Sequence, residues 1–237
     1  MLDDFIKACT AHEFKNGVPP NNKIKRHEWE SKLLYSVKSS LSNDCVLLDY
    51  GCGKYGTMRF SLWNRFPKSK YIGIDPAMRH RRKTNNMRSQ IKKTIKNNIV
   101  IEDKYKLHNL SYLSTAIEEA TCVVAGSVFT HLAWESIKDF LYQLDPFFGR
   151  GGEIGFTIFL GDEYIENFTG GKNFYKRKDA YHAVVTTIEQ YTDYCEEQGL
   201  QFTLLPYTYE LLHDLIKNPE GDIAITSQHF CNIRRNI

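Results

Sequence analysis

Residues 46 to 56 read Val-Leu-Leu-Asp-Tyr-Gly-Cys-Gly-Lys-Tyr-Gly, an apolar run that ends in an acidic residue and continues into closely spaced glycines. Gly51, Gly53 and Gly56 fit the spacing G-x-G-x-x-G. Glycines permit a tight turn between a strand and a helix, and they let backbone N–H groups approach a ligand that a Cβ would block. The stretch therefore predicts a strand, a turn and a helix that form a site for a nucleotide-like cofactor.

Asp49 narrows the choice of cofactor, because it lies two residues before Gly51 at the carboxyl end of the predicted strand. A dinucleotide would bring its pyrophosphate to this turn, where a carboxylate would repel it. A carboxylate suits a cationic group instead, such as the ammonium of an amino acid. This chemistry favours S-adenosylmethionine over NAD.

A second acidic residue follows the next short apolar run. Asp75 ends the stretch Tyr-Ile-Gly-Ile-Asp and lies 22 residues after Gly53. At the tip of the neighbouring strand of a doubly wound sheet, it is placed to accept hydrogen bonds from the ribose hydroxyls. The alternative is that Asp75 caps the following helix. Two strand-end acids on either side of a glycine turn favour the nucleoside site.

Apolar runs alternate with helical patterns along the rest of the chain, which predicts right-handed βαβ crossovers and a largely parallel sheet. The third strand is expected at 99–102 or at 105–109. A polar loop is expected at 161–180. The other expected strands are 45–50, 70–75, 121–127, 153–160, 200–206 and 223–233, and the expected helices are 26–41, 57–66, 133–145 and 182–198.

In these features the chain resembles the class I S-adenosylmethionine-dependent methyltransferases. Four stretches carry the resemblance: Leu48–Gly53, Gly73–Asp75, Ser127–Leu132 and Gly151–Ile154. The third, Ser-Val-Phe-Thr-His-Leu, resembles a subset that acts on small molecules and sugars. Many members have one residue between the second and third glycines, whereas Lys54 and Tyr55 both stand there in this chain.

The resemblance implies an α/β fold with a doubly wound, mostly parallel, Rossmann-like sheet of seven strands, of which the last two form an antiparallel pair. We expect residues 1–42 to form an N-terminal helical extension that packs at the sheet edge or covers the site. Residues 43–237 are then the S-adenosylmethionine-binding domain.

The resemblance also implies the roles of individual residues. Asp49 orients the glycine turn or the methionine ammonium, and Asp75 binds the ribose. Asp103 or Asn109 contacts the adenine amino group, depending on which run is the third strand. The expected cofactor-binding residues are Asp49, Gly51, Cys52, Gly53, Asp75, Pro76, Ser127 and Val128.

His131 is the candidate catalytic base, because it directly follows the predicted fourth strand and an imidazole has a suitable pKa near 6.5. The alternative is that a histidine at the start of a helix only binds backbone. The loop that follows the fifth strand often builds the acceptor pocket in this family. The candidate substrate-contacting residues are Phe129, Glu163, Tyr181 and His182.

The acceptor is expected to be a hydroxyl of a small molecule or of a glycan or sugar precursor. Amino-directed enzymes of the family carry an Asn/Asp-Pro-Pro-Tyr/Phe motif after the fourth strand, but Ala-Gly-Ser-Val occupies residues 125–128. The metal-binding carboxylates of catechol-type enzymes are not evident, and no metal site is expected. Methyl transfer needs a nucleophile about 3 Å from the methyl carbon, so positioning supplies much of the rate.

A basic segment offers an alternative function. Residues 76–101 contain no Asp or Glu but eight Lys and Arg residues between positions 79 and 96. Such a segment suits the phosphate of an acceptor, a membrane surface or RNA, or it is a solvated face. Because no aromatic residue lies between Tyr71 and Tyr105 to stack on bases, an RNA methyltransferase is the weaker interpretation. A non-catalytic, methyltransferase-like binding subunit is the other alternative.

The composition is typical of a globular protein, and we expect the protein to stay in the cytosol. Its 237 residues are 42% hydrophobic and 25% charged, with a net charge of +3. No apolar run approaches the ~18–20 residues that cross a bilayer, and the acidic start Met-Leu-Asp-Asp is unlike a signal peptide. The six cysteines are scattered without a C-x-x-C pair, as expected for reduced thiols.

Overall fold

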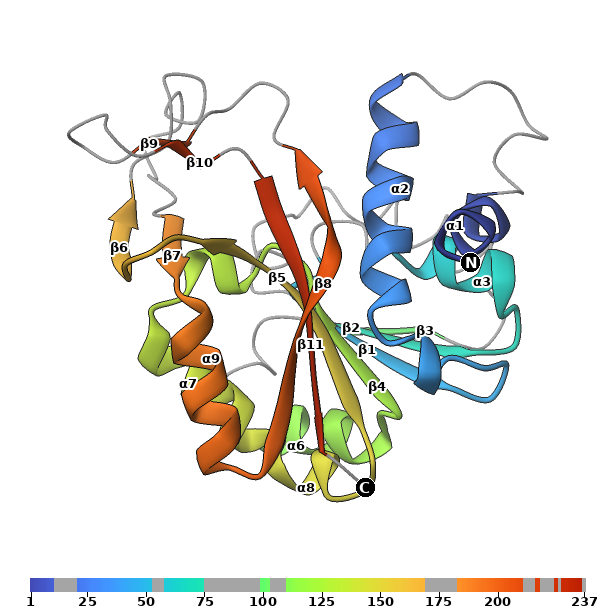
Figure 1. The fold of residues 1–237 in the computed structure, drawn as a ribbon. Coiled ribbons are helices and arrows are strands. Elements are labelled where there is room, and N and C mark those ends of the chain that lie inside the picture. The colour runs from blue at the N-terminus through green and yellow to red at the C-terminus, as the bar shows by residue number, and fades with distance from the viewer. Residues whose placement is uncertain are drawn as a thin grey trace, which may run out of the picture. The chain divides into compact units, whose positions relative to one another are not determined.

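The chain divides into two structural units, Met1–Val124 and Ala125–Ile237. The structure is a computed structural model, and it describes residues 1–10, 21–52, 58–74, 99–102, 110–168, 183–210, 216–217, 224–225 and 227–235 (Figure 1). The expected boundary at residue 42 stays a prediction.

Parallel strands form the sheet of the first unit. They are β1 (Val46–Tyr50), β2 (Lys70–Ile74), β3 (Ile99–Glu102) and β4 (Cys122–Ala125), in the order β3-β2-β1-β4. Leu47 of β1 pairs with Tyr71 of β2 on one side and with Cys122 of β4 on the other, and all three side chains are buried. Parallel strands are covered on both faces, which explains their nearly continuous apolar runs. The third strand is therefore the run at 99–102.

The N-terminal helices of this unit, α1 (Leu2–Thr10) and α2 (Asn21–Tyr35), pack with α3 (Met58–Arg65) (Figure 1). The Asn64 side chain donates a hydrogen bond to the backbone oxygen of Cys9 (2.5 Å), and the Arg65 guanidinium lies 4.6 Å from the centre of the Phe5 ring. The helix expected at 26–41 instead begins at 21 and ends at 35, followed by a 3-10 turn at Lys38–Ser40. A further helix, α6 (Leu110–Glu119), precedes β4.

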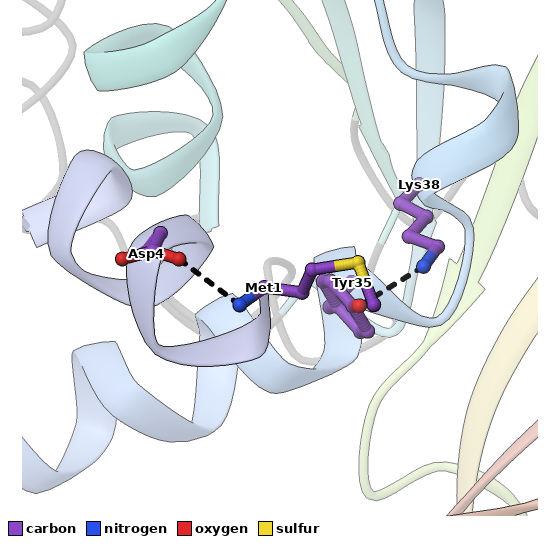
Figure 2. Close-up of polar contacts among 4 residues, drawn as sticks. All are labelled: Met1, Asp4, Tyr35 and Lys38. Carbon is purple, nitrogen blue, oxygen red and sulfur yellow. Dashed lines mark hydrogen bonds and ion pairs between the residues drawn. The ribbon is translucent and has the colours of Figure 1, made fainter.

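Exposed polar contacts lie at the start of α1 and at the end of α2 (Figure 2). The ammonium of Met1 lies 2.9 Å from the Asp4 carboxylate, and this hydrogen bond and charge lower the pKa of Asp4. Lys38 donates to the Tyr35 hydroxyl (2.9 Å). Such exposed pairs stabilise little. The buried Phe5 ring, which meets Tyr35 edge-on at 5.3 Å, contributes more to holding α1 on α2.

The second unit contains a mixed sheet. Its strands β5 (Glu153–Leu160), β11 (Ser227–Arg235) and β8 (Leu200–Glu210) lie in the order β5-β11-β8, and β11 is antiparallel to both neighbours. Short strands β6 (Ile165–Phe168) and β7 (Ala183–Thr186) pair with each other, and β7 is parallel to β5. Strands β9 (Ile216–Lys217) and β10 (Ala224–Ile225) form a separate pair.

Two sequence predictions for this unit are wrong. The loop expected at 161–180 contains β6, and the helix expected at 182–198 is divided into β7 and α9 (Ile188–Glu197). The cause lies at Thr187, whose side chain accepts from the backbone N–H of Gln190 while Gln190 accepts from Thr187. This capping box begins a helix, so the preceding buried Ala-Val-Val-Thr segment is free to pair as a strand.

Aromatic rings fill the core of the second unit. The helix expected at 133–145 forms as α7 (Trp134–Gln143), and a second helix, α8 (Asp145–Phe148), follows it with Pro146 in its first turn. The rings of Phe129 and Phe156 lie 4.9 Å apart, and Tyr191 stacks on Phe202 at 5.2 Å. Large buried rings of this kind supply much of the apolar area that stabilises a core.

The strand orders of the two units, four strands in β3-β2-β1-β4 and three in β5-β11-β8, confirm the predicted α/β class with a mostly parallel sheet. The antiparallel pair at the end of the chain is β8 and β11, as predicted. Within the described ranges no helix has the length and apolar character needed to cross a membrane.

Candidate functional site

The carboxyl end of β1 carries a buried carboxylate with a defined partner. Asp49 is 3% exposed, and its Oδ2 accepts a hydrogen bond of 2.5 Å from the hydroxyl of Tyr71, which is 0% exposed. In the strand register Asp49 lies opposite Gly73 and Leu47 lies opposite Tyr71, so the phenol reaches diagonally across the pair. A buried carboxylate requires such donors, because an uncompensated charge is costly away from water.

The absence of a side chain at Gly73 leaves space for the Tyr71 ring. A Cβ at position 73 would lie 2.9 Å from Cε1 of Tyr71 and 3.0 Å from Sγ of Cys52. The ring and the thiol therefore occupy the space over this glycine, as expected where a glycine in a strand marks a close approach. Tyr71 and Gly73 were not predicted as site residues, although a glycine inside an apolar run is a signal that points to them.

The chain turns directly after β1. Gly51 has a φ of 79°, which favours glycine, and the N–H groups of Gly51 and Cys52 both donate to the backbone oxygen of Ile74, at 2.7 and 3.1 Å. The turn is thereby attached to the carboxyl end of β2. Asp75 is the residue after Ile74 in the sequence. Gly53, Asp75 and Pro76 lie outside the described residues, as do Asp103 and Asn109.

The turn that follows β4 is built around Ser127 in the second unit. Ser127 has a φ of 55°, in the left-handed region, and its N–H donates to Oγ1 of Thr157 at 2.8 Å. The Gln228 amide donates to the Ser127 hydroxyl at 3.0 Å. Thr157 comes from β5 and Gln228 from β11, and both are buried. Ser127 was predicted from the sequence, but its two partners were not; a signal was available for Thr157, a polar residue inside the apolar run of β5.

A 3-10 turn, Phe129–His131, follows this serine. The His131 N–H donates to the oxygen of Val128 at 2.9 Å, and the His131 side chain is exposed. Phe129 is 0% exposed, with its ring packed against Phe140 and Phe156. The ring of Phe129 is therefore part of the core, where the sequence analysis expected a substrate contact.

Tyr164 connects the segment after β5 to α7. Its hydroxyl accepts a hydrogen bond of 3.0 Å from the Trp134 N–H and donates to the Glu166 carboxylate. Burial and the bond to Glu166 raise the pKa of Tyr164. Glu163 is exposed beside it. Tyr181 and His182, the other candidate substrate contacts, lie outside the described residues.

The described ranges hold no group of three or more His, Cys, Asp or Glu side chains placed to bind a metal ion. The polar features that the structure does define are a carboxylate at the end of β1, a glycine turn against β2, a strained serine after β4, and the exposed imidazole of His131 in the 3-10 turn that follows. A carboxylate attracts a cation, and an imidazole can accept a proton.

No protein-family model matches the chain, and no curated protein matches its sequence. Solved structures do match its fold. A SAM-dependent methyltransferase from Anabaena variabilis is 14% identical with a TM-score of 0.55, covering 99% of this chain and 95% of its own. A cyclopropane-fatty-acyl-phospholipid synthase-like protein from Lactobacillus casei is 10% identical, with a TM-score of 0.57 and 98% of both chains covered.

A third solved structure contains ligands. The 1,6-didemethyltoxoflavin-N1-methyltransferase from Burkholderia thailandensis, with bound 1,6-didemethyltoxoflavin and S-adenosylhomocysteine, is 10% identical with a TM-score of 0.51. The match covers 99% of this chain and 87% of that one. At these identities the likeness concerns the fold, which is that of the S-adenosylmethionine-dependent methyltransferases.

Proposed function

We propose that the protein is an S-adenosylmethionine-dependent methyltransferase that methylates a hydroxyl of a small molecule or of a glycan or sugar precursor in the cytosol. The observation that carries the proposal is the buried carboxylate of Asp49 immediately before the Gly51 turn, on a fold shared with methyltransferases. A fold alone does not define a function. Here the strand-end carboxylate provides the group that an amino-acid ammonium needs.

In this proposal, different residues bind different parts of the cofactor. Asp49 attracts the ammonium of the methionine moiety, directly or by orienting the turn. Gly51, Cys52 and Gly53 let the backbone approach the cofactor, and Asp75 followed by Pro76 binds the ribose hydroxyls. Ser127 and Val128 line the adenine or methionine side. The bound cofactor supplies an electrophilic methyl group on a sulfonium.

His131 acts as the general base in this proposal. The bound cofactor would supply its methyl group to the acceptor oxygen, and the imidazole of His131 would accept the proton that the hydroxyl loses. The exposure of the His131 side chain leaves it accessible to an acceptor and to water that removes the proton. His131→Ala should therefore lower kcat with little change in cofactor affinity, and the fall in kcat at low pH that protonation of an imidazole base causes should disappear.

The structural neighbours support a small acceptor. The Burkholderia thailandensis enzyme is named a 1,6-didemethyltoxoflavin-N1-methyltransferase, and a further neighbour of TM-score 0.51 is named a precorrin-6y C5,15-methyltransferase from Geobacter metallireducens. Glu163, Tyr181 and His182 are proposed to contact the acceptor. A phosphate or diphosphate on it would suit the cations at 79–96.

Titration calorimetry with S-adenosylhomocysteine tests the cofactor half of this function. Wild-type protein should bind the ligand, and both Asp75→Ala and Asp49→Asn should weaken binding at least tenfold. Asp44→Asn is the matched control, because Asp44 is an exposed acidic residue just before β1. No heat at high micromolar ligand with the wild type would refute the function.

The run of eight cations between 79 and 96 favours a second candidate, an RNA methyltransferase. It predicts RNA affinity that falls steeply with salt and is lost when Arg81, Arg82, Lys92 and Lys93 are neutralised together. Salt-independent binding, or no effect of the neutralised variant, would remove this candidate. Cofactor binding without methyl transfer to any offered hydroxyl or RNA would instead support a non-catalytic binding subunit.

A further inference from the structure

Ser127 adopts a backbone conformation that its residue type disfavours. Among the described residues other than glycine, it alone has a positive φ, at 55°. For a residue with a Cβ, the left-handed region costs about 1–2 kcal/mol. Such strain persists only where surrounding groups fix the conformation, and it concentrates at functional sites.

Two buried side chains fix it, and both come from distant parts of the sequence. Thr157 lies 30 residues further along the chain and accepts from the Ser127 N–H, while Gln228 lies 101 residues further and bonds the Ser127 hydroxyl. Their strands are neighbours, since β11 pairs with β5 with Phe230 opposite Thr157. Thr157 therefore holds the backbone of Ser127, and Gln228 holds its side chain.

We propose that Gln228 and Thr157 are positioning residues that hold the turn after β4 in its left-handed conformation and thereby place Ser127 for contact with the cofactor. The proposal rests on the proposed function, because the cofactor contact at Ser127 belongs to it. The role of Gln228 and Thr157 in holding the turn does not depend on the proposed function.

The choice of serine supports a functional role. Glycine would adopt this φ without strain, so a turn needed only to connect β4 to the next segment would be more stable with glycine. The chain instead keeps a hydroxyl and places two buried polar groups around it, each of which must be satisfied by a hydrogen bond. The constraint is thus on where the Ser127 hydroxyl lies.

Four variants test this assignment. Gln228→Met removes the amide at similar volume, and Ser127→Gly removes the hydroxyl that the amide holds. The double variant Gln228→Met/Ser127→Gly combines them. Asn232→Leu is the control, because Asn232 is also buried on β11 and donates to Glu153 of β5 at 3.2 Å, away from the turn. Two readouts are measured: hydrogen exchange of the Ser127 amide without ligand, and the Kd for S-adenosylhomocysteine.

Gln228→Met should raise the exchange rate at Ser127 and the Kd about fivefold to tenfold, as expected for loss of one hydrogen bond. Asn232→Leu should change neither, even if it lowers the Tm. Ser127→Gly should also raise the Kd, and Gln228→Met should add little to that loss in the double variant, because the hydroxyl that Gln228 holds is already gone. A Gln228 that acted only by touching the ligand would instead give losses that add in the double variant.

The positioning role and the proposed function can be refuted independently. Unchanged exchange at Ser127 in Gln228→Met would overturn the positioning role whether or not the protein binds S-adenosylhomocysteine. Changed exchange with unchanged Kd would overturn the link between the turn and the cofactor. Absence of binding by the wild type would refute the proposed function, and the exchange measurement would still decide how the turn is held.

Discussion

Replacement of Tyr71 by phenylalanine isolates the hydrogen bond to Asp49. The change deletes one oxygen, leaves no cavity of consequence and removes a donor that lies 2.5 Å from a carboxylate 3% exposed. A hydrogen bond to a charged group is worth about 1.5–3 kcal/mol. For a chain of this size each kcal/mol corresponds to roughly 2–4 °C in Tm, so we expect Tyr71→Phe to lower the Tm by about 3–12 °C.

Thermal unfolding of four proteins provides the assay: wild type, Tyr71→Phe, Asp49→Asn and the double variant. If the two side chains stabilise each other, the double variant should lose about 1.5–3 kcal/mol less than the sum of the single losses. Tyr142→Phe serves as the control, because its ring is 71% exposed and its loss should stay within about 0.5 kcal/mol. Additive losses, or a Tyr71→Phe effect no larger than that of Tyr142→Phe, would refute the reasoning.

Three further changes are checked by unfolding experiments. Thr187→Ala removes the cap of α9 and should cost about 1 kcal/mol, while Thr187→Ser should retain most of the stability. Gly152→Ala would press a methyl group into the buried Phe147 ring and should cost about 1–3 kcal/mol, more than Gly199→Ala, where only the φ of 64° opposes the methyl. Burial lowers the pKa of His229, so protonation favours the unfolded chain; stability should fall as the pH drops below about 6.5, and less so in His229→Gln.

The strands next to the glycine turns were predictable because their signals are local. β5 occupies 153–160 as predicted, since a continuous apolar run follows two glycines. β1 and β2 differ from prediction by one residue at one end. Runs of this kind are buried on both sides, and hydrophobicity alone delimits them.

The end of β8 was not predictable in the same way. A strand was expected to stop at Pro206, but β8 continues to Glu210. The strand order places β8 at the edge of its sheet, where a proline without an N–H is tolerated. The pairing with β11 shifts register between His229 and Cys231, opposite this proline. The edge position that lets β8 continue past Pro206 follows from the strand order, which the sequence near Pro206 does not show.

The candidate site likewise contains residues that were predictable from the sequence and residues that were not. Asp49 and Ser127 were found because strand ends and glycine spacing mark them. Their partners are remote in the sequence, with Tyr71 22 positions from Asp49 and Gln228 101 positions from Ser127. These partners depend on strand register and order, which no local pattern of the chain encodes.

Gly73→Ala tests how tightly the turn after β1 is coupled to this register. The new Cβ would lie 2.9 Å from the Tyr71 ring and 3.0 Å from the Cys52 thiol, so one of them must move. The ring is 0% exposed and bonded to Asp49, whereas Cys52 is 6% exposed and lies in the turn itself. We therefore expect Cys52 to shift, carrying the turn with it, and S-adenosylhomocysteine affinity to fall more steeply than Tm. Cys52→Ala should then restore part of the affinity of Gly73→Ala, since it removes the sulfur but keeps a Cβ at 3.2 Å. Rescue by Tyr71→Phe instead would show that the ring gives way, and would reverse the assignment of which side of the glycine is rigid.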